Sequence, residues 1–276
     1  MTGIAIRPGS IRAWSGGFSN LSSVLRAYGE GNIFGEAYGD GPVQVVWLHG
    51  WGRTSADFAS AAALLAHEGI ASVALDLPGF GVSPLPATAG GAALYARLLT
   101  PVLADISAGP LVLVGHSFGG RVATVVAATP GDHVRALVLT GVPLVRREFP
   151  PRSPLAYRVV RALRRRGLIS DARMEVARQK YGSSDYRRAS GLLRDIVVAS
   201  VNESYEDELS RISVPVALVW GENDHEVPVD VARRALALLS NSADAALDVV
   251  LDAGHFIPTE RPAALVAHAQ RLVVGT

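Results

Sequence analysis

Short, mainly apolar runs recur along the chain from about residue 43, and each ends in a polar loop that usually contains glycine. A strand with one face in water alternates apolar and polar residues, whereas these runs do not alternate. They therefore predict strands that are buried on both faces of a largely parallel sheet. The runs are Val43–Leu48, Ile70–Leu75, Leu111–Val114, Val134–Leu139, Val214–Trp220 and Leu247–Leu251.

Between these runs, apolar residues recur every three or four positions, which is the period of an amphipathic helix. Strands that alternate with helices predict an α/β fold, here a doubly wound and mostly parallel sheet covered by helices on both faces. The predicted helices are Asp57–His67, Ala92–Ile106, Gly119–Ala128, Val229–Leu239 and Pro262–Val273.

Two segments interrupt this alternation. Residues 144–210 have mainly helical patterns and no convincing strand, and they are far longer than the crossover that two parallel strands need. They predict a helical cap inserted into a core made of residues 1–143 and 211–276. Residues 1–30 mix glycine and serine with scattered aromatic residues, and we interpret them as an arm packed on the main body.

Composition narrows the class of protein. The 276 residues are 49% hydrophobic with a formal net charge of +1, which fits a globular protein and gives no global sign of nucleic-acid binding. The absence of cysteine excludes disulfides, thiolate metal sites and a cysteine nucleophile. No apolar run approaches the ~20 residues of a membrane-spanning helix, and no signal peptide is apparent. We expect a cytoplasmic protein without an integral membrane segment that acts on a small-molecule substrate and binds no nucleic acid.

The pattern G-x-S-x-G occurs at Gly115–Gly119, directly after a predicted strand and directly before a predicted helix. In that context the pattern predicts a sharp strand–turn–helix corner with Ser117 at its tip as a nucleophile. Glycine is needed on both sides because larger side chains would collide with the neighbouring backbone. The free N–H groups at the start of the helix favour negative charge developing beside Ser117.

A serine hydroxyl needs a base to remove its proton, and the base needs a carboxylate to fix its tautomer. His255 follows the last predicted strand and Asp224 follows the strand before it, so we predict a triad of Ser117, Asp224 and His255. We interpret His116 as a packed neighbour of the nucleophile. Three nearby carboxylates remain alternative acids: Glu222, Glu226 and Asp252.

Acyl transfer also requires N–H donors that stabilise a tetrahedral oxyanion. One predicted donor is the backbone N–H of Phe118, which follows the nucleophile. The other is the backbone N–H of Trp51, in the loop after the first predicted strand, where its indole would also line the substrate pocket. We expect His49, in the same loop, to bond the loop backbone.

Taken together, these motifs resemble the α/β-hydrolase superfamily from about Ile33 to the C-terminus. The resemblance implies an α/β-hydrolase core and is greatest for the branch with a helical cap, which contains esterases, lactonases and carbon–carbon bond hydrolases. Haloalkane dehalogenases and epoxide hydrolases are disfavoured because they carry an aspartate where this chain has Ser117. The matching stretches are residues 48–52, 76–83, 115–120, 220–224 and 253–256.

The predicted cap is rich in arginine, and Leu155, Val159 and Leu163 fall on one face of a helix whose other face is basic. We favour a solvated helix whose apolar face lies over the pocket. Two alternatives remain. The basic face attracts anionic lipid or another acidic partner, or one arginine binds a substrate carboxylate or phosphate. The candidates for substrate binding are Arg187, Arg188 and Arg194.

The leading hypothesis is hydrolysis of an ester, thioester, lactone or amide through an acyl-Ser117 intermediate. Three alternatives remain open: hydrolysis of a carbon–carbon bond in a diketone-like substrate, transfer of the acyl group to an acceptor other than water, and ligand binding with little turnover. The histidines are scattered and no phosphate-binding glycine loop is present, so we expect no metal and no cofactor. The sequence does not indicate an oligomeric state.

Overall fold

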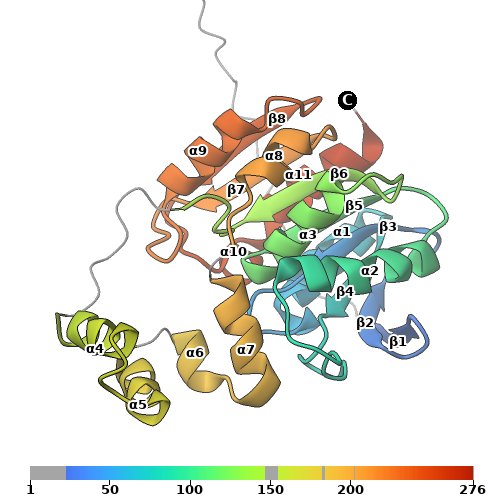
Figure 1. Ribbon diagram of the computed structural model, residues 1–276. Coiled ribbons are helices and arrows are strands. Elements are labelled where there is room, and N and C mark those ends of the chain that lie inside the picture. The colour runs from blue at the N-terminus through green and yellow to red at the C-terminus, as the bar shows by residue number, and fades with distance from the viewer. Residues whose placement is uncertain (1–22, 147–154, 182–183, 202, 276) are drawn as a thin grey trace, which may run out of the picture.

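The computed structural model of the chain describes residues 23–146, 155–181, 184–201 and 203–275. Within them, eight strands form one sheet in the order β1-β2-β4-β3-β5-β6-β7-β8 (Figure 1). The strands are β1 (Val24–Tyr28), β2 (Ile33–Tyr38), β3 (Val43–Leu48), β4 (Ala71–Asp76), β5 (Leu111–His116), β6 (Val134–Thr140), β7 (Val216–Gly221) and β8 (Ala245–Val250).

The sheet is parallel from β4 to β8, which confirms the predicted α/β class. The antiparallel hairpin of β1 and β2 was not predicted. β1 is exposed along most of its length, so its residues give no buried pattern. Gly35, in the middle of β2, would normally weaken a strand, but a side chain there would press against Leu75 and the backbone of Ala74 in β4.

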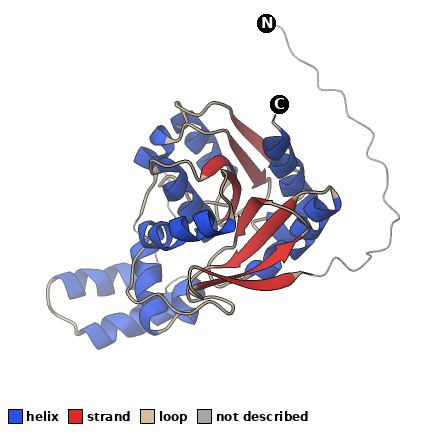
Figure 2. Ribbon diagram, turned by 90° about the vertical axis from the view of Figure 1, so that its right-hand side faces the viewer, coloured by secondary structure: helices blue, strands red, loops and turns tan. Residues whose placement is uncertain are grey.

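Helices cover both faces of the sheet, as Figures 1 and 2 show. Helices α2, α3, α8 and α9 pack on one face, and α1 and α11 pack on the other. Their bounds are η1 (Ser55–Phe58), α1 (Ala59–His67), α2 (Ala92–Ile106), α3 (Phe118–Ala128), α8 (Glu206–Arg211), α9 (Val229–Leu238), α10 (Ile257–Glu260) and α11 (Pro262–Val274).

The central strands are mainly apolar because each contributes to two cores. In β5, Leu111 and Leu113 enter the core beneath α2 and α3, whereas Val112 and Val114 enter the core beneath α1 and α11. Successive side chains of a strand point to opposite faces, so a sheet covered on both faces needs apolar residues throughout. This double burial explains the apolar runs of the central strands. The prediction of double burial is wrong for β8, which lies at the edge of the sheet and alternates between half-buried and exposed positions.

Between β6 and β7 the described residues form four helices before α8: α4 (Leu155–Arg165), α5 (Asp171–Tyr181), α6 (Ser184–Arg188) and α7 (Gly191–Ser200). α4 and α5 project away from the sheet (Figure 1). All of α8 except its last residue falls within the range predicted for the cap, yet its Leu209 is buried in the main core.

The expectation that the apolar face of α4 lies over the pocket is wrong. Leu155 is 72% exposed and Val159 is 50% exposed, while Leu163 is half-buried. Periodicity reveals that a helix has an apolar face but does not say what covers that face. No helix within the described ranges has the length and apolar character needed to cross a membrane.

Candidate active site

Three loops at the carboxyl edge of the sheet carry the predicted triad. Ser117 directly follows β5, Asp224 lies three residues beyond the end of β7, and His255 lies in the loop after β8. β5 pairs with β6, β6 with β7, and β7 with β8, all in parallel. The carboxyl ends of these strands therefore lie at the same edge, where α/β sheets place their ligands.

Ser117 occupies a strained backbone conformation at this edge. Its φ is 48° and its ψ is −111°, a region that residues with a Cβ rarely adopt. Two bonds fix the turn: the Ser117 N–H donates to the Thr140 carbonyl at 3.0 Å, and the Gly119 N–H donates to the His49 carbonyl at 3.0 Å. The sharp turn projects Ser117 from the edge of the sheet where α3 begins.

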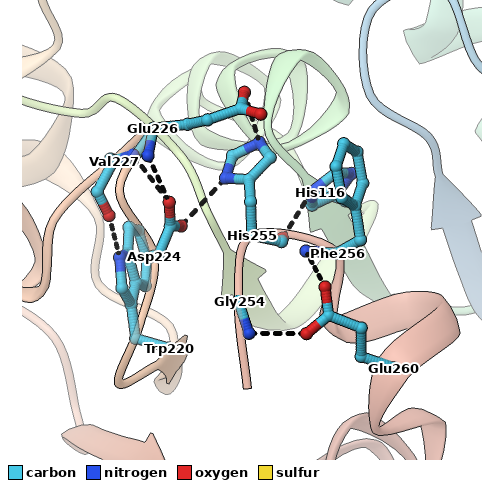
Figure 3. A network of polar contacts seen from close by, with 9 residues as sticks. All are labelled: His116, Trp220, Asp224, Glu226, Val227, Gly254, His255, Phe256 and Glu260. Atoms are coloured by element: carbon cyan, nitrogen blue, oxygen red, sulfur yellow. Dashed lines mark hydrogen bonds and ion pairs between the residues drawn. The ribbon is translucent and has the colours of Figure 1, made fainter. Parts of the chain in front are cut away.

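His255 and Asp224 form a buried hydrogen-bonded pair (Figure 3). His255 Nδ1 lies 2.8 Å from Asp224 Oδ2, and both residues are buried. The other carboxylate oxygen accepts hydrogen bonds from the N–H groups of Glu226 at 2.9 Å and Val227 at 2.7 Å. A carboxylate only accepts, so Nδ1 of a neutral His255 carries the proton and Nε2 keeps its lone pair. This tautomer leaves Nε2 able to take a proton from another group.

Of the three alternative acids, only Glu226 has an ion-pair contact with His255 among the described residues. Its Oε2 lies 3.7 Å from Nε2, and its side chain is 65% exposed. Glu222 instead accepts a hydrogen bond from the Asp252 N–H at 3.4 Å. Asp224 is the carboxylate that is buried, held by two backbone donors and within hydrogen-bond distance of the imidazole.

Glu260, which the sequence analysis did not single out, fixes the backbone on both sides of His255. Its carboxylate accepts hydrogen bonds from the Gly254 N–H at 2.5 Å and the Phe256 N–H at 3.2 Å (Figure 3). Glu260 ends the short helix α10, so it reaches back to the loop that precedes its own helix. A carboxylate five residues after a candidate base is the sequence signal that would have indicated this clamp.

The glycine after β6 allows the close approach of the histidine loop. A Cβ at Gly141, whose φ is +59°, would lie 2.8 Å from Cε1 of His255. The neighbouring Thr140 carbonyl accepts the bond from Ser117 N–H. The end of β6 is therefore in contact with both the serine turn and the histidine ring.

His116 is buried next to the serine, and its ring lies 4.9 Å from the His255 ring, centroid to centroid. Its Nε2 lies 3.0 Å from the His255 carbonyl oxygen, which can only accept, so Nε2 carries the proton. Burial, reinforced by the proximity of His255, lowers the pKa of His116 to about 3. His116 is therefore neutral at physiological pH.

The two predicted oxyanion donors lie in the loop after β3 and at the start of α3. Phe118 is the first residue of α3, so its N–H has no acceptor within the helix. The Trp51 ring packs edge-on against Phe118, with centroids 5.3 Å apart. The Trp51 loop is fixed by His49, whose Nε2 accepts the Leu77 N–H at 3.0 Å while Nδ1 donates to the Gly50 carbonyl at 2.7 Å.

The helical segment contacts this site through Trp51. Tyr186, Ala189 and Val197 form a small apolar cluster against which Trp51 and Leu193 pack. The Trp51 ring thus contacts both Phe118, at the start of α3, and the cluster formed by α6, α7 and a residue between them. This contact places α6 and α7 next to the site, whereas α4 and α5 lie farther out (Figure 1).

The three arginines proposed to bind substrate are in different surroundings. Arg187 and Arg188 are exposed on α6. Arg194 donates to Glu175 Oε1 at 2.8 Å and to the Ala189 carbonyl at 3.0 Å, and it lies over the Tyr186 ring. Within the described ranges, no hydrogen bond, ion pair or ring contact joins any of the three arginines to the triad residues. The same ranges contain no cluster of three or more potential metal ligands.

Comparison with known proteins places this arrangement in a family. The model of the alpha/beta hydrolase family matches residues 45–269. The chain is 28% identical, over 80% of its length and 84% of the relative, to a 2-hydroxy-6-oxononadienedioate/2-hydroxy-6-oxononatrienedioate hydrolase of Klebsiella pneumoniae subsp. pneumoniae. It is 29% identical, over 76% of its length and 86% of the relative, to a non-heme chloroperoxidase of Streptomyces lividans.

A solved structure with the same fold is that of 2-hydroxy-6-oxo-6-phenylhexa-2,4-dienoate hydrolase from Rhodococcus sp. strain RHA1. The two chains superpose with a TM-score of 0.68 and 21% identity, over 93% of this chain and 100% of the other. At that identity the likeness concerns the fold.

Proposed function

Because this chain belongs to the alpha/beta hydrolase family and is a hydrolase, we propose that Ser117, Asp224 and His255 form its catalytic triad. The reaction we propose is hydrolysis of an ester, thioester, lactone or amide of a small organic molecule. It runs through an acyl enzyme on Ser117.

In the first half-reaction, Ser117 Oγ attacks the substrate carbonyl carbon while His255 Nε2 takes the hydroxyl proton. The Asp224 carboxylate stabilises the imidazolium that forms. The backbone N–H groups of Phe118 and Trp51 stabilise the tetrahedral oxyanion, each contributing about 3 kcal/mol. The intermediate collapses when the bond to the leaving group breaks, and His255 returns its proton to that group.

In the second half-reaction, water attacks the acyl carbon and gives a proton to His255 Nε2. The new tetrahedral intermediate collapses by breaking the bond to Ser117 Oγ, which recovers the proton from His255. The acid is released and the enzyme returns to its starting state. Every proton transfer thus uses the same imidazole nitrogen.

The observation that carries this proposal is the 2.8 Å contact between His255 Nδ1 and Asp224 Oδ2. The second oxygen of Asp224 is already occupied by two backbone N–H groups, so the carboxylate has a fixed orientation. It therefore holds His255 in the tautomer that a general base needs. The strained turn at Ser117 supports the same role, because backbone strain of this kind concentrates at functional positions.

A second candidate is hydrolysis of a carbon–carbon bond in a diketone-like substrate by the same triad. It is favoured by the relative from Klebsiella pneumoniae, whose name describes a hydrolase of hydroxy-oxo-dienedioates and which aligns over 80% of this chain. The two candidates share the serine and the base and differ in the bond that breaks. Products of the two substrate types distinguish them directly.

We further propose that residues 144–210 act as a cap whose helices α6 and α7 wall the substrate pocket beside Trp51. The exposed Arg187 and Arg188 are then the arginines that could meet an anionic substrate, because Arg194 is already paired with Glu175. The cytoplasmic location, the absence of nucleic-acid binding and the absence of a cofactor stay predictions.

The test is turnover of p-nitrophenyl esters, lactones, amides and vinylogous diketones by the native chain and by Ser117→Ala. We expect serine-dependent turnover of one class, which identifies the bond that is cleaved. Labelling of Ser117 by a fluorophosphonate without hydrolysis of any substrate would favour acyl transfer. If Ser117 is not labelled and no substrate is turned over, the proposed triad is overturned and ligand binding is favoured.

A further inference from the structure

Positive charge is concentrated in the two helices that project from the body. Residues 155–181 contain eight basic and two acidic residues, a net charge of +6. Since the whole chain carries +1, all other residues together carry −5. The basic residues are Arg158, Arg161, Arg164, Arg165, Arg166, Arg173, Arg178 and Lys180.

The same segment, two helices and the turn between them, exposes large apolar side chains. Leu155 and Val159 lie one turn apart on α4, both largely exposed, and Leu168 and Val176 are 65% and 69% exposed. Isolated exposed apolar residues are ordinary, but several on one small unit mark an interaction surface. We call residues 155–181 the basic hairpin.

Basic and apolar side chains adjoin one another on this hairpin. On a helix with 3.6 residues per turn, Arg158 lies beside Leu155, three positions before it, and Arg161 and Arg165 continue the row of Arg158. All three arginines are exposed. This arrangement gives α4 a cationic border along an exposed apolar strip.

A cavity of about 600 Å³ opens between the basic hairpin and α7. Its lining combines the same two chemistries, with Arg161, Arg165 and Arg178 beside Met174, Val197 and Val201. An occupant that matches it needs both negative charge and hydrocarbon.

We propose that the basic hairpin docks this protein on an anionic phospholipid surface. An amphipathic helix with arginines at its border binds such a surface by placing its apolar residues among the acyl chains and its cations among the headgroups. A nucleic acid would satisfy the charge but leave the exposed leucines and valines in water. The position of the hairpin at one end of the molecule lets it reach a flat surface (Figure 1).

This docking goes beyond the proposed hydrolysis and does not depend on it. The hairpin carries none of the triad or oxyanion residues, and α6 and α7 lie between it and Trp51. Vesicle binding and substrate turnover can therefore be measured separately, and a negative result for one proposal does not affect the other.

The experiment is co-sedimentation of the full chain carrying Ser117→Ala, which prevents lipid cleavage, with sonicated vesicles. One set is phosphatidylcholine alone and the other is an equal mixture of phosphatidylcholine and phosphatidylglycerol. We expect binding to the anionic vesicles to exceed binding to the neutral ones at least tenfold and to weaken as salt is added.

Replacing Arg158, Arg161 and Arg165 together by Gln should lower the partition coefficient about a hundredfold, at about fivefold for each arginine. Replacing Leu155 and Val159 by Ser should lower it about tenfold without changing the net charge. The matched control replaces Arg26, Arg97 and Arg233 by Gln, three exposed arginines on β1, α2 and α9. It removes the same charge from the body and should change binding less than threefold.

Circular dichroism and soluble-ester turnover, measured with Ser117 present, show whether each variant is folded. Equal binding to both vesicle types, or equal losses in the hairpin and control variants, would overturn the proposal. Absence of vesicle binding together with binding to polyglutamate would assign the surface to an acidic protein. A dimer in solution that the Leu155 and Val159 replacements dissociate would assign it to a second copy of the chain.

Discussion

His116 donates a hydrogen bond from Nε2 to the carbonyl oxygen of His255 at 3.0 Å, across 139 positions of sequence. The residue next to the proposed nucleophile thereby fixes the backbone of the proposed base. Its other ring nitrogen, Nδ1, is buried with no hydrogen-bond partner among the described residues. His116 therefore links the serine turn to the histidine loop by one hydrogen bond. Proton transfer requires these two segments to keep their relative positions.

Burial of the His116 ring makes stability depend on pH. The pKa of His116 is about 3 in the folded chain, against an ordinary value of about 6.5, because burial disfavours the imidazolium. Above pH 6.5 neither the folded nor the unfolded state protonates His116. Below pH 6.5 His116 becomes protonated in the unfolded state but stays neutral in the folded state. The free energy of unfolding therefore falls as the pH drops from 6.5 towards 3.

At pH 5 this loss amounts to about 2 kcal/mol relative to pH 7. Urea unfolding at the two pH values measures it, and His116→Gln, which keeps a donor for the His255 carbonyl, should shrink the difference by that amount. His49, whose pKa is also lowered by burial, remains in the variant and contributes equally to both chains. An unchanged difference between pH 7 and pH 5 would contradict the account.

Two replacements of Ser117 distinguish the backbone strain at this position from the role of its hydroxyl as nucleophile. We expect Ser117→Ala and Ser117→Gly both to lower kcat about 10⁵-fold, because each removes the nucleophile. Only glycine adopts a φ of 48° with a ψ of −111° at low cost, so Ser117→Gly should raise the free energy of unfolding by about 1 kcal/mol over Ser117→Ala. Urea unfolding of the two variants measures this, and equal stabilities would argue against stored strain.

The choice of acid is tested by two isosteric replacements. Asp224→Asn should lower kcat about 10³- to 10⁴-fold, because an amide stabilises the wrong tautomer of His255. Glu226→Gln should change kcat less than threefold, since its side chain is mostly exposed and lies 3.7 Å from Nε2. Steady-state kinetics on the substrate class that the turnover test identifies decide between Asp224 and Glu226, and a reversed order would make Glu226 the acid.

Glu260 is a positioning residue for the histidine loop. Glu260→Ala removes the acceptor for the Gly254 and Phe256 N–H groups, so the loop that carries His255 loses its clamp. We expect kcat to fall about tenfold while KM stays within twofold. Glu260→Asp, which keeps the charge, should recover part of the loss, and full activity in Glu260→Ala would remove this role.

Arg194 should behave differently from the exposed arginines of α6. It bonds Glu175 and the Ala189 carbonyl, so Arg194→Gln should loosen the contact between α5, α6 and α7 and increase proteolysis there. Arg187→Gln and Arg188→Gln should leave proteolysis unchanged. If either contacts an anionic substrate, KM for that substrate should rise about tenfold while KM for its neutral analogue is unchanged.

The sequence predicted the elements that depend on local pattern. Double burial makes the central strands mainly apolar, so runs such as Val43–Leu48 were recognisable, and Ala92–Ile106 was predicted with the bounds that α2 has. The exposed β1 and the glycine-interrupted β2 lack such a pattern, so the sequence did not predict the β1–β2 hairpin. The triad residues were named from motifs that each follow a strand, and their catalytic role stays a prediction.

Only the tertiary structure decided which groups meet. Asp224 and Glu226 lie two positions apart in the same loop, and packing buries one against Nδ1 of His255 while leaving the other exposed near Nε2. The contact of His116 with the His255 carbonyl depends on how distant strands align, and the exposure of Leu155 on what covers α4. Sequence patterns record each residue's own burial preference, whereas these relationships depend on the partners that long-range folding supplies.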